Sequence, residues 1–511
     1  MYAEDFLPLD GNSLTIDGII DAVYKDKKIT LSDKAVNKIK RAHETVCTIV
    51  DSDDTVYGVN TGFGALSTIS ISQDKVKKLQ ENIVRSHASG SGEPFPISVV
   101  KAVLILLTNG LSKGHSGCRE TVVRTIIDMY NKGVYPVIPS QGSLGASGDL
   151  IPLAHLALVL TGEGEAYYQG KRFSGKTAMR KAGIEPIRLE AKEGLSLING
   201  TYVMTALGSL ILHRSEKVVK LADIAAGITL EVTRGSKTPE RPEIHKVKPH
   251  PGQIKTASNI IKLVENSEII ESHKYCSRVQ DAYSLRCVPQ VHGAVKDAVR
   301  YCRSAFDIEL NAATDNPLVF GDDVISAGNF HGQPLAIPLD TLGIAVTNLG
   351  NISERRIDRL MNPALSELPA FLTPSPGLNS GYMLSHYLAA ALTFENKGLA
   401  TPGSIDSVPV SANKEDFNSN GMWCARKAWK IVENTEKIIA IELLCAVQAL
   451  DFVEGWKPGK GTQAAYRIIR EKVPKLQRDR IIHKDIDAVT DLIQSDRILD
   501  VVESAVGNLE V

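Results

Sequence analysis

Apolar residues recur along this chain at the spacing of an α-helix rather than with the alternation of a β-strand. One stripe has steps of 4, 3, 4 and 3 residues, which place its members on one face of a helix: Leu335, Leu339, Leu342, Val346 and Leu349. A second stripe runs through residues 425–450. Such stripes are typical of helices packed in a bundle, so the chain is predicted to be mainly α.

The same periodicity predicts further helices over residues 33–50, 99–111, 120–132, 201–233 and 289–310. Ser32 is the predicted N-cap of the first, with Asp33 in the first turn, where the helix dipole favours an acidic residue. Glycine and proline concentrate between the helices, so functional residues are expected in loops. A boundary is expected near residue 220, dividing a loop-rich N-terminal domain (1–220) from a long-helix bundle with a C-terminal helical region (221–511).

The charge of the chain is nearly balanced. Its 511 residues are 43% hydrophobic, and 58 Lys and Arg side chains stand against 59 Asp and Glu side chains. A chain of this length can bury a sizeable core. Proteins that bind a phosphate backbone carry an excess of basic side chains, so nucleic acid is not expected as a partner.

Neither a membrane nor an oxidising compartment is expected. The longest apolar stretches, 99–107 and 151–160, are shorter than the roughly 18 to 20 residues of a membrane span. Residues 1–9 include Glu4 and Asp5 and lack the basic and apolar segments of a secretory signal. The seven cysteines are odd in number and never spaced Cys-x-x-Cys, so a cytoplasmic location is predicted.

Residues 170–177 match the phosphate-loop pattern Gly-x4-Gly-Lys-Ser/Thr. A phosphate loop needs an apolar strand before it and a helix whose first amides face the phosphates. Here the preceding segment, 162–169, is polar and glycine-rich, and residues 169–172 resemble a turn between two short strands. A surface hairpin is therefore predicted rather than a nucleotide site.

Residues 139–152 form a loop that could make its own electrophile. Gly148 lacks the Cβ that would hinder its amide nitrogen from attacking a nearby carbonyl group. If this nitrogen adds to the Ala146 carbonyl with loss of water, and Ser147 then loses its hydroxyl group, the product is a ring with an exocyclic methylene. That methylene would accept a nucleophile.

The same loop also predicts the start of a helix. Asp149, with Pro152 in the first turn, is typical of a helix N-terminus, whose positive dipole end would help the ring accept electrons. The alternative is an ordinary glycine-rich turn that caps a helix over 150–160. The loop by itself leaves both interpretations open.

With its neighbours, Ala146-Ser147-Gly148 resembles the methylidene-imidazolone motif of the aromatic amino acid ammonia-lyases, most closely that of the histidine-specific members. Other blocks agree in the same order: residues 57–64, 86–90, 199–201, 280–287, 316–317, 328–332 and 395–397. The resemblance spans nearly the whole chain. It implies a long-helix bundle of the ammonia-lyase and fumarase-like type, a 4-methylidene-imidazol-5-one (MIO) cofactor formed from residues 146–148, and a homotetramer with shared active sites.

Eliminating ammonia requires removal of a weakly acidic β proton and capture of a poor leaving group. Tyr57 matches the family's candidate base, and a phenol needs its pKa lowered from about 10 to act near neutral pH. Arg286 offers a planar guanidinium for the substrate carboxylate. Tyr283 and Asn199 match positions that contact the electrophile and the reacting amine or carboxylate. Without the resemblance, Tyr57 would be interpreted as a packing residue and Arg286 as half of a surface ion pair.

Three more positions take their roles from the resemblance. Phe330 matches an aromatic wall near the ring, and Gln280 matches a hydrogen-bonding residue behind it. His87 matches the position that meets the substrate side chain, and the Ser86-His87 pair is similar to the histidine-specific type. Tyrosine-specific relatives also place a histidine near here, so His87 indicates a polar ring without deciding which one.

Glu415 matches the acidic residue of a Gln-Glu-Asp-His block found in histidine-specific members. This chain has Lys414 before it and Phe417 in place of the block's histidine. The predicted reaction is non-oxidative elimination of ammonia from L-histidine, giving urocanate. A tyrosine ammonia-lyase or tyrosine aminomutase with the same cofactor is the alternative.

No catalytic metal is predicted, because the chain lacks His-Glu-x-x-His and other paired histidine spacings. A non-catalytic helical assembly protein would explain the apolar stripes but not the cyclisable loop together with Tyr57 and Arg286. The expected partner is thus a small amino acid, with neither nucleic acid nor a membrane involved.

Overall fold

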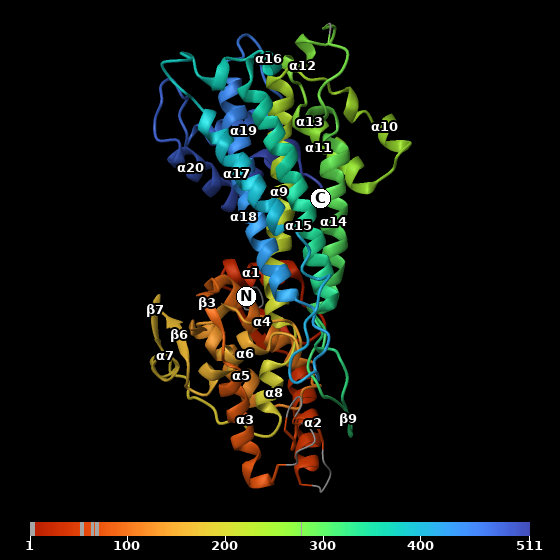
Figure 1. Cartoon of the computed structure of the whole chain (residues 1–511), viewed down its shortest axis with the longest axis vertical. Coiled ribbons are helices and arrows are strands. Elements are labelled where there is room, and N and C mark those ends of the chain that lie inside the picture. The colour runs from red at the N-terminus through yellow and green to blue at the C-terminus, as the bar shows by residue number, and fades with distance from the viewer. Residues whose placement is uncertain (1–5, 52–55, 63–65, 67–70, 277) are drawn as a thin grey trace. The chain divides into compact units, whose positions relative to one another are not determined.

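The computed structural model describes residues 6–51, 56–62, 66, 71–276 and 278–511 (Figure 1). It is mainly helical with a few short strands, which confirms the predicted fold class. Its longest helices are α9 (Tyr202–Val232), α14 (Val288–Glu309), α15 (Gln333–Met361) and α18 (Gly421–Leu450). Each of the four was predicted from apolar periodicity alone.

The chain divides into two compact units. The first consists of Met1–His213, Arg303–Asp340 and Pro402–Arg426, and the second of Arg214–Cys302, Thr341–Thr401 and Lys427–Val511. The expected division at residue 220 assigned 303–340 and 402–426 to the C-terminal part, whereas the structure has them in the first unit. The reason is that each of the four long helices contributes residues to both units.

The first unit contains eight of the shorter helices and all the described strands. Its helices are α1 (Ile16–Tyr24), α2 (Asp33–Val50), α3 (Gln73–His87), α4 (Ile97–Ser112), α5 (Glu120–Lys132), α6 (Leu150–Leu160), α7 (Gly175–Lys181) and α8 (Glu193–Ile198). Its strands are β1 (Phe6–Leu9), β2 (Lys28–Leu31), β3 (Ser91–Pro94), β4 (Tyr135–Pro136), β5 (Pro139–Gln141), β6 (Glu165–Tyr168), β7 (Lys171–Ser174), β8 (Leu318–Phe320) and β9 (Asp323–Ile325). β1 pairs with β2 in parallel, while β3–β5, β4–β6–β7 and β8–β9 are antiparallel.

The second unit adds shorter helices to the remaining parts of the four long ones. These are η2 (Thr238–Glu240), α10 (Pro242–Lys246), α11 (Pro251–Leu263), α12 (Glu268–Ser272), α13 (Tyr283–Arg286), α16 (Pro363–Ser366), η3 (Ala370–Leu372), α17 (Met383–Leu399), α19 (Lys460–Arg470), α20 (His483–Gln494) and α21 (Arg497–Val506).

Local sequence signals fixed several elements correctly. α2 spans the predicted residues, and the Ser32 side chain accepts a hydrogen bond from the Ala35 amide at 3.2 Å, as an N-cap should. β6 and β7 form the predicted hairpin, whose turn residues Gln169 and Gly170 have φ of 49° and 73°. The phosphate-loop match is thus a hairpin followed by α7.

The apolar stripe of α15 faces the core as predicted, because all five of its Leu and Val side chains are fully buried. Among the described residues, α15 alone has the length and composition of a membrane span, and 67% of its most apolar window is buried inside the protein. Packing within the protein accounts for that apolar character.

A network of buried charges lies inside the second unit. Asp223 accepts hydrogen bonds from Lys296 Nζ at 2.7 Å and from His292 Nδ1 at 2.8 Å. Arg356 pairs with Glu442 through two hydrogen bonds of 2.5 and 2.8 Å. Burial lowers the pKa of His292, so its neutral ring donates to Asp223 and accepts from Arg356. Each buried charge therefore has an opposite charge as its partner.

Candidate active site

The predicted cofactor loop lies between β5 and α6, and Gly148 meets the backbone of Gly200 there. A Cβ built on Gly148 would lie 2.1 Å from Gly200 O, and the φ of Gly148 is 75°. The Asp149 amide donates to Gly200 O at 2.7 Å, and the Gly200 amide donates to Ser147 O at 3.4 Å. Only glycine fits at position 148, for both steric and conformational reasons. The backbone beyond α8 thus fastens the loop on both sides of Gly148.

Asp149 joins this loop to a second helix. α6 begins at Leu150 as predicted, but the Asp149 carboxylate makes no capping bond to it. Instead, Asp149 Oδ2 accepts hydrogen bonds from the Val203 and Met204 amides at 2.8 Å each, at the start of α9. Burial raises the pKa of Asp149 to about 7, although these hydrogen bonds lower it. The N-termini of α6 and α9 therefore meet at the loop.

Sequence reasoning missed the part played by Ser143. Its hydroxyl group donates to Asp149 Oδ1 at 3.2 Å and accepts from the Gly145 amide at 3.2 Å. Gly145 has a φ of 70°, so the backbone turns sharply here. Ser143 stands in the recognised motif, but no spacing rule marked its side chain as a partner of Asp149.

Asn199 presents an unpartnered acceptor beside the loop. It is the C-cap residue of α8, is 4% exposed and directly precedes Gly200. Its Oδ1 is buried and has no hydrogen-bond partner among the described residues. Leaving a buried amide oxygen unsatisfied costs about 1 to 3 kcal/mol, so this atom is suited to meeting a ligand or a group formed on the loop.

Tyr57 lies half-buried in a loop that packs against two other parts of the first unit. A Cβ on its neighbour Gly58, which has a φ of 75°, would lie 2.7 Å from Leu195 Cδ2 and 3.0 Å from Pro317 Cδ. The tyrosine loop thus rests on α8 and on the segment before β8. Phe63 and Gly64, which complete the matching block, lie outside the described residues.

His87 ends α3, and its segment is attached to the helix that follows the cofactor loop. Its Nδ1 lies 3.1 Å from Ser86 Oγ, and burial lowers the pKa of His87, so the ring is neutral at neutral pH. The Gly90 amide donates to His155 Nε2 on α6 at 3.0 Å. His155, which the sequence did not mark, thus holds the 87–90 segment against α6.

Glu415 lies half-buried in the loop 404–420. Its backbone pairs with Val410 at 2.9 Å, and burial raises the pKa of its carboxyl group. Phe417, which differs from the family block, stacks on His331 with 5.9 Å between ring centres and 20° between planes. His331 follows the half-buried Phe330, directly before α15. The residue at 417 thus affects the surroundings of Phe330 through His331.

Two hydrogen bonds join the Glu415 loop to the cofactor loop. Ser419 Oγ donates to Gly145 O at 3.2 Å, and the Asn420 amide donates to Leu144 O at 2.8 Å. Ser419 is fully buried. The segment expected to recognise the substrate side chain is therefore tied directly to the segment expected to form the electrophile.

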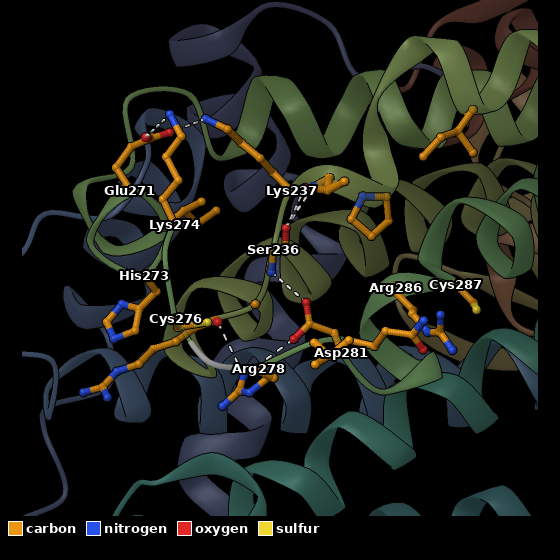
Figure 2. Close-up of a pocket in the computed structure, with 18 of the residues that line it drawn as sticks. Ser236, Lys237, Glu271, His273, Lys274, Cys276, Arg278, Asp281, Arg286 and Cys287 are labelled. Atoms are coloured by element: carbon orange, nitrogen blue, oxygen red, sulfur yellow. Dashed lines mark hydrogen bonds and ion pairs between the residues drawn. The ribbon is translucent and has the colours of Figure 1, made fainter.

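The other three predicted residues lie in the second unit. Gln280 and Arg286 line a cavity of about 680 Å³ that also contains Asp281 (Figure 2). The Arg286 guanidinium lies 4.6 Å from the Tyr283 ring centre, and Tyr283 is 70% exposed. Arg286 Nε is buried without a hydrogen-bond partner among the described residues. A guanidinium stacked on an aromatic ring presents a planar set of N–H donors that matches the geometry of a carboxylate.

The structure thus places the predicted residues in two groups. The first unit holds Tyr57, His87, Ala146, Ser147, Gly148, Asn199, Phe330 and Glu415, and the second holds Gln280, Tyr283 and Arg286. Within the described ranges, no group of three His, Cys, Asp or Glu side chains could hold a metal ion.

Comparisons with known proteins agree over nearly the whole chain. The model of the aromatic amino acid lyase family matches residues 14–471. Histidine ammonia-lyase from Alkaliphilus oremlandii is 51% identical over 500 residues, covering 98% of both chains. The structure of histidine ammonia-lyase from Trypanosoma cruzi is similar with a TM-score of 0.91 at 43% identity, covering 98% of this chain and 96% of the other. Tyrosine aminomutase from Streptomyces globisporus gives a TM-score of 0.93 at 36% identity, covering 99% and 100%.

We expect Asp149→Ala to lower the free energy of unfolding by about 1 to 3 kcal/mol, because two backbone amides at the start of α9 lose their acceptor. Asp149→Asn keeps an oxygen in place and is the matched control, with a smaller loss. Thermal unfolding followed by circular dichroism measures both. Equal losses for the two variants would contradict the capping role.

The control variant also gives a pH test. The pKa of Asp149 is raised from 3.8 to about 7, so the folded protein binds this proton more tightly than the unfolded chain. The stability that the folded protein gains from binding this proton is complete below a pH of about 4 and is lost as the pH rises to about 7. Asp149→Asn should lack this part of the pH dependence of stability.

Proposed function

The chain belongs to the aromatic amino acid lyase family, and we propose that it removes ammonia from L-histidine to give urocanate. The main support for this chemistry is the close backbone contact between Gly148 and Gly200, which leaves no room for a Cβ on Gly148 and lies beside the unpartnered Asn199 oxygen. Histidine as substrate is supported by relatives at 51% and 48% identity, from Alkaliphilus oremlandii and Gloeobacter violaceus, that are histidine ammonia-lyases.

The residues of the loop fit an MIO group formed from Ala146, Ser147 and Gly148. Gly148 nitrogen would bond to the Ala146 carbonyl carbon with loss of one water, and Ser147 would lose a second water to leave a methylidene group. When present, this group supplies the electrophile that the amine requires. Asn199 Oδ1 offers a hydrogen-bond acceptor to the substrate amine beside this group, and the N-termini of α6 and α9 favour electron density on the ring.

The remaining residues bind the substrate and move its proton. Arg286 takes the substrate carboxylate through its planar guanidinium, which is held against the Tyr283 ring. Tyr57 removes the β proton. Tyr283 and Asn199 contact the reacting amine, while Phe330 closes one side of the site and Gln280 supports it by hydrogen bonding.

Substrate choice is assigned to His87 and Glu415. Burial lowers the pKa of His87, so its neutral ring can exchange a hydrogen bond with the substrate imidazole. Glu415 accepts a hydrogen bond from the N–H of the substrate imidazole and stabilises positive charge on the ring. A phenol would offer this carboxylate only one hydroxyl proton, so the pair favours histidine over tyrosine.

We also propose a cytoplasmic homotetramer in which chains share active sites. The exposed Tyr283 and the unpartnered Arg286 Nε belong to the second unit, and the cofactor loop belongs to the first. A half-buried arginine stacked on an exposed tyrosine is suited to completing the site of another chain. We also propose a small amino acid as the partner, with no nucleic acid or membrane. The balance of 58 basic and 59 acidic side chains leaves no excess of positive charge for a phosphate backbone.

The function is tested with Ser147→Ala, which removes the hydroxyl group that must leave. The wild type should convert L-histidine to urocanate and yield a peptide spanning residue 147 that is two waters lighter than encoded. Ser147→Ala should keep its helical content while kcat falls by orders of magnitude. A kcat close to that of the wild type in this variant would contradict the proposed chemistry.

Shared sites predict complementation between two inactive chains. Tyr57→Phe and Arg286→Ala should each be nearly inactive alone, because one loses the base and the other the carboxylate contact. Co-expressing them should restore part of the activity, since some sites would combine an intact Tyr57 with an intact Arg286 from another chain. Shared sites are ruled out if light scattering shows a monomer and that monomer is fully active.

Glu415→Gln tests the substrate assignment because it removes the charge and keeps the size. We expect a loss of about 1.5 to 3 kcal/mol in transition-state stabilisation with L-histidine, the range for a charged hydrogen bond. Activity toward tyrosine should start low and should not fall in parallel. If the wild type has a higher kcat/KM for tyrosine than for histidine, the alternative of a tyrosine lyase or aminomutase replaces histidine.

A further inference from the structure

Lys192 places a positive charge in the interior of the first unit. It directly precedes α8, its φ is 66°, and its side chain is fully buried. The ammonium donates to Asp315 Oδ2 at 2.7 Å and to Ser196 Oγ at 3.2 Å. Apolar residues of similar volume would often give equal stability at such a position. A buried ion pair here therefore indicates that the positions of the two joined segments matter.

On one side, the pair fixes α8 and therefore the cofactor loop. α8 is 6 residues long, with Lys192 before its first turn and Asn199 at its end. Gly200 follows and bonds to the backbone of both Ser147 and Asp149. A shift of α8 would move Gly200, and the cyclisable turn would move with it.

On the other side, the pair fixes the segment before β8. Asp315 Oδ1 accepts from the Asn316 amide at 2.7 Å, and Asn316 Oδ1 accepts from the Ala327 amide at 2.7 Å. Pro317 comes next and forms one wall of the pocket that receives Gly58. Leu195 of α8 forms the other wall. The Tyr57 loop therefore rests on the two elements that this ion pair joins.

We propose that Lys192 and Asp315 are positioning residues, whose ion pair fixes the Tyr57 loop relative to the cofactor loop. Neither side chain is assigned a contact with substrate. The pair acts through Gly200 on the turn that forms the electrophile, and through Leu195 and Pro317 on the loop that carries the base. This inference rests on the proposed function for the role of Tyr57.

The test removes the charge pair while keeping its volume. Lys192→Met with Asp315→Asn leaves no uncompensated charge, so the fold should survive with a Tm near that of wild type. The matched control is Lys296→Met with Asp223→Asn, a buried Lys–Asp pair of the same 2.7 Å length in the second unit. Mass spectrometry gives the fraction of chains whose residue-147 peptide is two waters lighter.

In the Lys192 and Asp315 double variant, the cyclised fraction should fall. The kcat per cyclised chain should fall about 100-fold, the loss expected for a misplacement of roughly 1 Å, while KM for L-histidine changes by less than about threefold. The control should show neither loss. The proposal is overturned if the double variant folds with both quantities near wild type, or if the control loses as much.

Asp315→Glu keeps the test decisive if the double variant does not fold. It retains both charges and lengthens the acidic side chain by one methylene group, which shifts the 2.7 Å ion pair with Lys192 Nζ. A lower kcat per cyclised chain at unchanged Tm supports positioning, and wild-type values for both kcat and the cyclised fraction contradict it. The cyclised fraction can be measured without substrate. A wild type that releases no urocanate would therefore refute the proposed function, while the effect of the ion pair on the cofactor loop could still be measured.

Discussion

The contact between the backbones of Gly148 and Gly200 is the constraint on which the rest of the first unit depends. A Cβ on Gly200 would lie 2.5 Å from Thr314 Oγ1, and one on Gly148 would lie 2.1 Å from Gly200 O. Two chain segments can approach this closely only where both lack side chains. The loop beyond β5, the end of α8 and the start of α9 are thereby brought to one point, and the site is built around it.

The electrostatics of that point follow from burial. The N-termini of α6 and α9 both direct positive dipole ends there, and a fully ionised carboxylate would offset them. Because burial raises the pKa of Asp149 to about 7, its negative charge is only partly developed near neutral pH. The dipoles therefore remain available to an electron-accepting group on residues 146–148, while Asp149 still caps α9.

The sequence predicts those features that depend on residues close together along the chain, such as helices, hairpins and short motifs. Periodicity and capping placed α2 and the hairpin of β6 and β7, and the Ala146-Ser147-Gly148 motif was visible as a string. The partners of these residues were not visible, because Lys192 and Asp315 are 123 positions apart and Ser419 and Gly145 are 274 apart. Packing alone decides such pairs, and no local pattern records them. The two compact units likewise join segments that lie far apart in the sequence.

The residues assigned to chemistry and those assigned to substrate choice are held in different ways. Gly148 and Asn199 are both buried, and a Cβ at 148 would meet the backbone of Gly200, so few substitutions fit there. Glu415 lies in a loop where Phe417 is 60% exposed, and such positions can change without disturbing the core. The bond from Ser419 to Gly145 still fixes that loop against the cofactor segment. This arrangement allows the substrate side chain to change while the reaction stays the same, which agrees with the shared fold of histidine ammonia-lyase and tyrosine aminomutase.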